Sequence, residues 1–178
     1  PPRYENSGAL VVKVRKAVIK LNKMNTQGKY KISRYYANGQ LETETNFKDG
    51  KEDGLWKGWR ESGQLEYEVN FKDGKRDGLG KWWYEDGQAC QLLKTEKNYK
   101  DGERDGLEKH WYDNGQLQSE ANYKNGEIDG LSKTWYEDGQ LEYEGNYKDG
   151  KRDGLSKTWY EDGQLESTRY YTDGYQVL

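Results

Sequence analysis

Short runs in which apolar and polar residues alternate follow one another along the chain, and turn-forming residues separate them. Residues 131–136 and 140–148, for example, are rich in Leu, Tyr and Trp and are joined by Glu137-Asp138-Gly139. Runs of this kind between Gly- and Asp-containing turns are typical of β-strands joined in hairpins. The frequent glycines would interrupt any long helix. The pattern therefore predicts an all-β chain.

The runs recur with a period of 24 residues, D-G-L-x-K-x-W-Y-E-D-G-Q-L-E-x-E-x-N-Y-K-D-G-K-x, from about residue 31 to residue 174. Five of the units open on an Asp-Gly pair, at Asp53-Gly54, Asp77-Gly78, Asp105-Gly106, Asp129-Gly130 and Asp153-Gly154. A degenerate unit precedes them, with Tyr35 and Tyr36 in the Trp-Tyr place. One spacing is 28 residues because four residues, roughly Ala89-Cys90-Gln91-Leu92, are inserted. Residues 31–178 are therefore predicted to be six repeats of one array, whose units are too short to be stable alone.

Residues 1–30 are predicted to be a capping segment in front of the array. The β-branched residues between Leu10 and Met24, followed by the turn Asn25-Thr26-Gln27-Gly28, favour strands. The alternative is a basic amphipathic helix, because the Lys and Arg side chains of this segment fall on one half of a helical wheel. The sequence leaves both open and favours the strands.

The loop at residues 137–139 decides which side chains share a face of the sheet. A two-residue turn would pair Trp with Glu across the hairpin. A three-residue loop, with a left-handed Gly after a type I turn, instead pairs Trp135 with Leu141 and Lys133 with Tyr143. Because a slip of one residue moves every side chain to the other face, the hydrophobic pattern favours the three-residue loop.

The same loop at Lys148-Asp149-Gly150 would place Tyr143 opposite Leu155 and carry the apolar face into the next unit. The predicted structural face holds Trp59, Trp83, Trp111, Trp135, Trp159, Leu131, Leu141, Tyr143, Tyr147 and Leu155. The predicted polar face holds Ser132, Thr134, Tyr136, Glu142 and Glu144. The predicted architecture is an elongated, single-layer antiparallel β-meander.

Composition narrows the class of protein. Hydrophobic residues make up 31% and charged residues 34% of the chain, which is typical of disorder, but the 14% of aromatic residues recur in register and indicate an ordered array. The net charge is −3 with no basic stripe, so nucleic acid is not an expected partner. No run approaches the ~20 apolar residues of a membrane span, so membrane insertion is not expected.

Two motifs carry a resemblance to a known family. They are Trp135-Tyr136-Glu137-Asp138-Gly139-Gln140-Leu141 and Asn146-Tyr147-Lys148-Asp149-Gly150-Lys151, with their copies in the other units. In these motifs the chain resembles the MORN repeat variant, as found in bacterial exported 24-residue repeat proteins and in proteins labelled as the YwqK antitoxin family. The resemblance implies a twisted antiparallel sheet used in protein interaction, and it brings no catalytic residues. The chain departs from the motif at the insertion near Cys90 and at Arg60, where a Tyr is expected.

Candidate catalytic and metal-binding chemistry is sparse. The chain has one His, His110, and one Cys, Cys90, and neither stands in a nucleophile, phosphate-loop or metal-ligand motif. Glu66-x-Glu68 and Glu142-x-Glu144 are paired acids, but their repetition indicates the solvated side of a strand rather than a catalytic pair with two distinct environments. The Asp-Gly turns lack the ladder of oxygen ligands that calcium loops carry. We therefore expect no enzymatic activity, no cofactor and no metal.

Aromatic residues that break the repeat pattern are the candidate partner site. Trp56 and Trp82 are predicted on the polar face, where Gly58 and Gly80 leave room beside them. The complete candidate set is Trp56, Arg60, Trp82, Tyr84, His110 and Tyr112. Trp, Tyr and Arg are enriched at interface hot spots, and this set points to another protein as the partner. The alternative is a partly exposed patch, or one that the amino-terminal strands cover.

Three functions compete at this point. A non-enzymatic protein-interaction scaffold is favoured, with export to a bacterial surface as the expected location and a cytoplasmic location as the alternative. An antitoxin or immunity-type inhibitor is the second, because an acidic chain suits a basic toxin. A carbohydrate-binding surface built from aromatic rows is the third. Exposed edge strands also make a homodimer one of the expected states.

Overall fold

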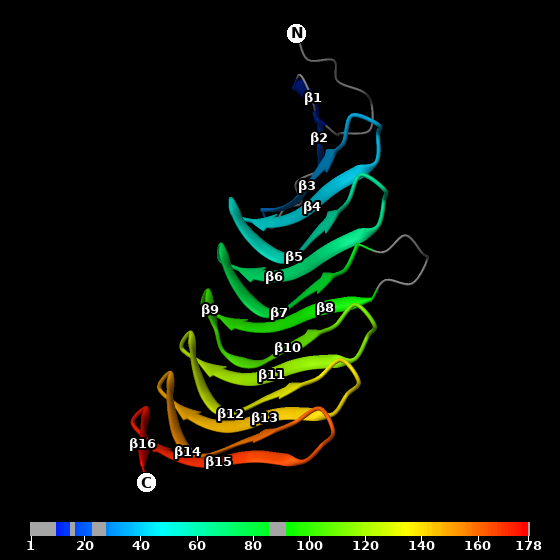
Figure 1. Ribbon diagram of the computed structural model, residues 1–178. Coiled ribbons are helices and arrows are strands. Elements are labelled where there is room, and N and C mark those ends of the chain that lie inside the picture. Colours follow the sequence, from blue (N-terminus) through cyan, green and yellow to red (C-terminus); the bar gives the residue numbers. More distant parts are fainter. Residues whose placement is uncertain (1–9, 15–16, 23–27, 86–91, 178) are drawn as a thin grey trace. The chain divides into compact units, whose positions relative to one another are not determined.

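The fold is an all-β antiparallel meander, as the alternating pattern predicts. The computed structural model describes residues 10–14, 17–22, 28–85 and 92–177. All regular secondary-structure elements within these ranges are β-strands. The chain divides into two compact units, unit 1 (residues 1–91) and unit 2 (residues 92–178). Within each unit, strands that follow one another in the chain lie side by side and antiparallel (Figure 1).

Unit 1 contains seven described strands in chain order. They are β1 (Leu10–Val14), β2 (Ala17–Asn22), β3 (Lys29–Tyr35), β4 (Leu41–Lys48), β5 (Lys51–Trp59), β6 (Leu65–Lys72) and β7 (Lys75–Trp83). Strand β1 pairs with β2, and β2 pairs with β3. The described residues between Leu10 and Asn22 are therefore strands rather than a helix, and Met24 lies outside the described residues.

Unit 2 contains nine described strands. They are β8 (Leu93–Lys100), β9 (Glu103–Arg104), β10 (Gly106–Trp111), β11 (Leu117–Lys124), β12 (Glu127–Trp135), β13 (Leu141–Lys148), β14 (Lys151–Trp159), β15 (Leu165–Thr172) and β16 (Tyr175–Val177). The short β9 pairs only with β8, and the meander continues from β8 to β10. Cys90 and the inserted residues up to Gln91 lie outside the described residues.

The loop between β12 and β13 has the predicted three residues. The Gly139 N–H donates to the Tyr136 carbonyl, and the Tyr136 N–H donates to the Gln140 carbonyl, both at 2.9 Å. Gly139 has a φ of 89°, so the loop is a type I turn followed by a left-handed residue. Trp135 pairs with Leu141 as predicted. Equivalent loops follow β3, β5, β10 and β14.

Beyond this first pair, the register of the hairpin differs from the prediction. A β-bulge shifts the pairing by one residue, so that Tyr143 pairs with Thr134 and Glu144 pairs with Lys133. Glu142 is the extra residue of the bulge, and its carboxylate accepts a hydrogen bond from the Thr134 hydroxyl at 2.9 Å. The predicted pairing of Lys133 with Tyr143 is therefore wrong, because a bulge adds one residue to one strand alone.

The reversal between β13 and β14 is a two-residue turn and not the predicted three-residue loop. Lys148 pairs directly with Lys151, which leaves Asp149 and Gly150 as the turn. Their φ values are 47° and 78°, and two positive φ values define a type I′ turn. Asp-Gly favours this turn, and its twist matches the twist of the flanking strands.

The shorter turn moves two tyrosines to the other face. Tyr143 pairs with Thr158 and not, as predicted, with Leu155. Tyr147 pairs with Arg152 next to the turn. Because directly paired residues share a face, Tyr143 and Tyr147 lie with the Ser and Thr side chains rather than on the predicted structural face.

The Asp-Gly pair that opens each repeat forms a break in the ladder that an Asn side chain bridges. Gly106 has a φ of 105°, and a Cβ built there would lie 3.2 Å from the Asn98 Cβ. The Asn98 side-chain amide donates to the Leu107 carbonyl at 2.6 Å. The same bond joins Asn46 to Leu55, Asn70 to Leu79 and Asn146 to Leu155. The repeated Gly and the repeated Asn are thus two parts of one local structure.

The register gives each sheet two distinct faces. The Lys/Glu face carries the rows Glu44, Lys57, Glu68 and Lys81 in unit 1 and Glu96, Lys109, Glu120, Lys133, Glu144 and Lys157 in unit 2. Ion pairs such as Lys133 to Glu144 at 3.1 Å link neighbouring strands there. Within residues 28–85 and 92–177, the buried apolar side chains are Val69 and Tyr171, and both lie on the opposite face.

Candidate binding face

The face opposite the Lys/Glu face is the Ser/Thr face. In unit 2 it carries Thr95, Glu108, His110, Ser119, Ser132, Thr134, Tyr143, Gly145, Ser156 and Thr158. In unit 1 it carries Thr43, Thr45, Trp56, Gly58, Tyr67, Val69, Gly80 and Trp82. Trp56, Trp82 and His110, which the sequence singles out, therefore lie on this face of their own units.

In unit 1 aromatic rings fill the Ser/Thr face. The Trp56 ring lies edge-on to Tyr67 at a centroid distance of 6.1 Å and is 5.2 Å from the ring of Phe71. The Tyr67 ring covers Gly58, because a Cβ built on that glycine would overlap the ring. The Trp82 ring covers Gly80 in the same way, at 2.8 Å. The room that the two glycines leave is thus occupied by rings of the same sheet.

Tyr112 and Arg60, also in the predicted set, have a shared structural role. The Tyr112 hydroxyl donates to the carbonyl of Trp135, 23 residues further on, at 2.8 Å. Tyr36 and Tyr136 make the same bond in their repeats. Arg60 stands in this Tyr place, and its Nη2 donates to the Trp83 carbonyl at 2.9 Å. Arg60 therefore replaces the tyrosine bond instead of breaking the repeat. Tyr84 holds the same place in the third repeat.

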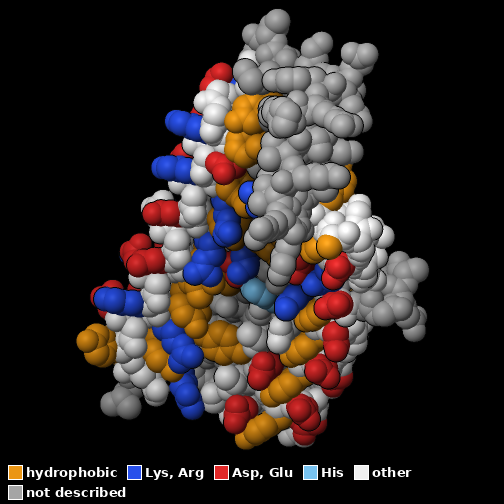
Figure 2. Space-filling view, turned by 90° about the horizontal axis from the view of Figure 1, so that it is seen from above, with side chains coloured by type: hydrophobic (Ala, Val, Ile, Leu, Met, Phe, Trp, Pro, Cys, Tyr) orange, Lys and Arg blue, Asp and Glu red, His pale blue; other side chains and the backbone are white. Residues whose placement is uncertain are grey.

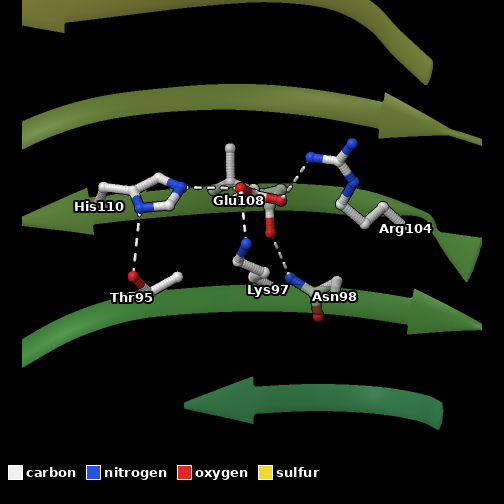
Figure 3. A network of polar contacts seen from close by, with 7 residues as sticks. Thr95, Lys97, Asn98, Arg104, Glu108 and His110 are labelled. Atoms are coloured by element: carbon white, nitrogen blue, oxygen red, sulfur yellow. Dashed lines mark hydrogen bonds and ion pairs between the residues drawn. The ribbon is translucent and has the colours of Figure 1, made fainter. Parts of the chain in front are cut away.

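In unit 2, His110 belongs to a polar network around a buried carboxylate (Figure 3). Glu108 is 5% exposed. It lies 2.7 Å from His110 Nε2, 3.3 Å from Lys97 Nζ and 3.5 Å from Arg104 Nη1, while His110 Nδ1 is 3.1 Å from the Thr95 hydroxyl. Burial opposes ionisation of Glu108, but the hydrogen bond with His110 and the charges of Lys97 and Arg104 outweigh it and lower the Glu108 pKa. The network holds a fixed carboxylate charge.

A hollow of about 360 Å³ opens on the Ser/Thr face of unit 2. Strands β12 to β15 line it, and its lining includes Glu142, Tyr143, Tyr147, Arg152, Thr158 and Glu166. The hydroxyls of Tyr143 and Tyr147 are 3.1 Å apart. A Cβ on Gly145 would overlap the Tyr143 hydroxyl, so this glycine lets the ring lie flat on the sheet. The hollow is therefore a candidate ligand site.

Arg152 stands at one end of the hollow among tyrosines. Its Nη1 donates to the Tyr171 hydroxyl at 3.2 Å, and its Nε lies 3.5 Å from the Tyr147 hydroxyl. The guanidinium lies 5.6 Å from the Tyr143 ring centre. The bond with Tyr147 raises the Arg152 pKa, and burial raises the pKa of Tyr143. At this end of the hollow, a guanidinium is therefore surrounded by tyrosine side chains.

The sequence did not point to the residues of this hollow. Its prediction for β13 placed Tyr143 and Tyr147 on the other face, so the tyrosines and Arg152 were not seen as one group. A comparison of equivalent positions would have found them, because Arg104 is followed four residues later by Glu108 and Arg152 by Ser156. The six predicted site residues are divided, with Trp56, Arg60, Trp82 and Tyr84 in unit 1 and His110 and Tyr112 in unit 2.

Two further properties of the described part of the chain bear on its chemistry. Its residues include no group of three or more His, Cys, Asp or Glu side chains placed to hold a metal ion. It also contains no helix long and apolar enough to cross a membrane.

Comparison with known proteins agrees with the repeat pattern. A protein-family model described as the MORN repeat variant matches residues 28–49, 52–73, 104–125, 128–149 and 152–173. The stretch between the second and third matches contains the four-residue insertion. A search of curated proteins finds none that matches the chain.

Proposed function

Because the chain belongs to the MORN repeat variant family, we propose that it is a non-catalytic scaffold that binds another protein through the Ser/Thr face. An open sheet of such repeats fits a protein-interaction scaffold. The face offers the residue types that protein interfaces use, namely aromatic rings in unit 1 and hydroxyls, tyrosines and an arginine in unit 2.

One observation carries the proposal: the sheet keeps its large side chains at its surface instead of enclosing them. Within residues 28–85 and 92–177, only Val69 and Tyr171 are buried among the apolar side chains, although the chain contains 7 Trp and 16 Tyr. On the Ser/Thr face, Trp56, Tyr67, Trp82 and Tyr143 are all partly exposed. Hydrophobic side chains accordingly stand among charged ones on the surface that Figure 2 shows. Apolar surface that stays in contact with water favours association with a partner.

The six candidate residues contribute in two ways under this proposal. Trp82 and His110 lie on the Ser/Thr face, are partly exposed and would contact the partner directly. Arg60 and Tyr112 tie one repeat to the next through a carbonyl, so they would hold the face in shape. Trp56 does both, since its ring packs on neighbouring rings of the same face.

Neighbouring residues on opposite faces supply a matched test. Trp82→Ala and His110→Ala alter the Ser/Thr face, whereas Lys81→Ala and Lys109→Ala alter the Lys/Glu face one position away. The immobilised chain and each variant would be used to capture a protein from the native host, with mass spectrometry to identify it. We expect the first pair to lose a protein that the second pair retains, with circular dichroism melts showing that all four variants fold. Equal capture by all four would reject the face.

A second candidate, an inhibitor that covers the cleft of a toxin, is favoured by the acidic balance of the chain. The net charge of −3 would attract a basic toxin and raise the association rate. Purified chain added to such a toxin should then slow its reaction, and the effect should weaken with salt. A toxin whose rate is unchanged at saturating chain is not its target.

A further inference from the structure

Arg152 lacks the carboxylate that its counterpart in an earlier repeat has. Arg104, 48 positions earlier in the repeat pattern, lies 3.5 Å from the carboxylate of Glu108. The residue that corresponds to Glu108 in the repeat of Arg152 is Ser156. Within the described residues, the polar partners of Arg152 are tyrosine hydroxyls and none is a carboxylate. No carboxylate of the described residues therefore neutralises the positive charge at this end of the hollow.

Glu142 and Glu166 likewise have no positively charged side chain as a partner among the described residues. Glu66, at the equivalent position of the second repeat, accepts a hydrogen bond from Arg60 Nη1 at 2.8 Å. In the repeats of Glu142 and Glu166, the position of Arg60 is taken by Tyr136 and Tyr160. No described Lys or Arg lies within ion-pair distance of either carboxylate, and the recorded partner of Glu142 is the Thr134 hydroxyl. The negative charges of these two carboxylates are therefore not neutralised by any described Lys or Arg.

The open charges of opposite sign lie at opposite ends of the same hollow. Arg152 follows the two-residue turn between β13 and β14, whereas Glu142 follows the three-residue loop at the other end of β13. All three charged residues line the hollow. Its volume, about 360 Å³, lies within the range of ligand sites in proteins. The hollow is therefore a dipolar site, with hydroxyl donors between its poles.

We infer that this hollow binds a dipolar segment of the partner protein, with an Asp or Glu side chain at Arg152 and a Lys or Arg side chain at Glu142 and Glu166. A guanidinium fork matches a carboxylate with two parallel hydrogen bonds, and tyrosine hydroxyls can donate to the same oxygens. A polyanion would be repelled by the two carboxylates, and a polycation by Arg152. The inference rests on the proposed function, because it names the chemistry of the protein that the scaffold binds.

Other repeats of this chain show which substitutions would neutralise the charges of the hollow. Ser156→Glu gives Arg152 the carboxylate that Glu108 gives Arg104. Tyr136→Arg gives Glu142 the guanidinium that Arg60 gives Glu66, and Arg60 also shows that an arginine there keeps the bond to the next Trp carbonyl. Both variants copy arrangements that this chain already folds. Lys133→Gln, on the Lys/Glu face of the same hairpin, is the control.

The test is a titration of the full chain with short blocked peptides, followed through the backbone amide signals of β12 to β15 and the Arg152 Nε–H signal in 1H–15N spectra. One peptide carries Glu and Lys separated by one Gly, and its partners carry Gln for Glu or norleucine for Lys. Glucuronic acid is titrated as the acidic-sugar arm. Melting curves of each variant confirm that it is folded.

We expect saturable shifts at millimolar concentration with the Glu-Lys peptide, and binding weaker by about tenfold or more when either peptide charge is removed. Ser156→Glu and Tyr136→Arg should weaken binding to a similar degree, and Lys133→Gln should leave it unchanged. Three results would overturn the inference: no saturable shift with any peptide, binding by Ser156→Glu and Tyr136→Arg that is as tight as binding by the natural chain, or tighter binding of glucuronic acid than of every peptide.

The two proposals fail in different ways. Suppose that the captured host protein depends on Trp82 and His110 but is retained by Ser156→Glu and Tyr136→Arg. The scaffold function would then stand, and the dipolar site would be rejected. If the peptides bind as described but no captured protein depends on the Ser/Thr face, the site would stand and the scaffold function would be rejected.

Discussion

Replacing Glu108 by Gln should destabilise unit 2 although it changes the shape of one side chain very little. The Glu108 carboxylate is 5% exposed and neutralises Lys97 and Arg104, with His110 completing the network. Gln keeps a hydrogen-bonding side chain there but removes the negative charge. Lys97 and Arg104 would then face each other across neighbouring strands without a counter-charge.

The magnitude follows from the exposure of the partners. Removing one member of a fully buried ion pair costs about 3–5 kcal/mol. The side chains of Lys97 and Arg104 are 27% and 40% exposed, so water screens the charges that remain. We therefore expect a loss of about 2 kcal/mol, which corresponds to a fall of about 8–16 °C in the melting temperature of a domain of the size of unit 2.

The pH dependence has a definite sign. The pKa of Glu108 is lower in the folded chain than its ordinary value. The stability that its charge contributes is therefore fully present above the unfolded pKa of about 4.3 and is lost as the pH falls through the lowered folded pKa. The difference between the natural chain and Glu108→Gln should be constant near neutral pH and should shrink in acid below about pH 4.

Urea unfolding followed by Trp fluorescence, together with hydrogen exchange of β8 and β10, would measure the effect. Glu120→Gln is the control, because Glu120 pairs with Lys109 at 3.8 Å on the Lys/Glu face and its side chain is 28% exposed. That variant should lose less than about 1 kcal/mol. Equal losses in the two variants, or a Glu108→Gln loss that is the same at pH 7 and pH 3, would refute the reasoning.

Three further predictions concern the devices that set the register. Gly58→Ala should displace the Tyr67 ring, cost about 1–3 kcal/mol in a urea melt and shift the Trp emission, whereas an unchanged melt would show that the ring has room to move. Tyr112→Phe removes a hydrogen bond to the next repeat and should lower the free energy of unfolding by about 0.5–1.5 kcal/mol in thermal unfolding. The control variant Tyr160→Phe, at a half-exposed position, should melt like the natural chain. Asp149→Asn should keep full stability and Asp149→Val should lose about 1–2 kcal/mol by the same measurement, because only the former residue tolerates the positive φ of this turn.

Much of the fold was readable from single residues and their spacing. The period of the repeat located the strands, and the pairing of Trp135 with Leu141 followed from the three-residue loop. The unusual residues Trp56 and Trp82 were correctly expected on the face of Ser and Thr, because alternation along one strand does not depend on its partners. The use of these residues in binding remains a prediction.

The relation between neighbouring strands was decided only in three dimensions. Asp138-Gly139 and Asp149-Gly150 are the same dipeptide, yet only Gly139 is left-handed in the first loop, whereas both residues have positive φ in the second. Asp-Gly is compatible with either turn, so its letters do not give the number of residues in the reversal. The bulge at Glu142 adds another shift that no local signal marks.

The sequence by itself therefore determined the repeat, the strands and the alternation within each strand, since these depend on local geometry. The tertiary structure decided which strand faces meet, because one residue more or less in a turn or bulge inverts every position that follows. That inversion moved Tyr143 and Tyr147 beside Arg152 and placed Glu144 opposite Lys133. The hollow and its unneutralised charges therefore depend on the number of residues in that turn and bulge.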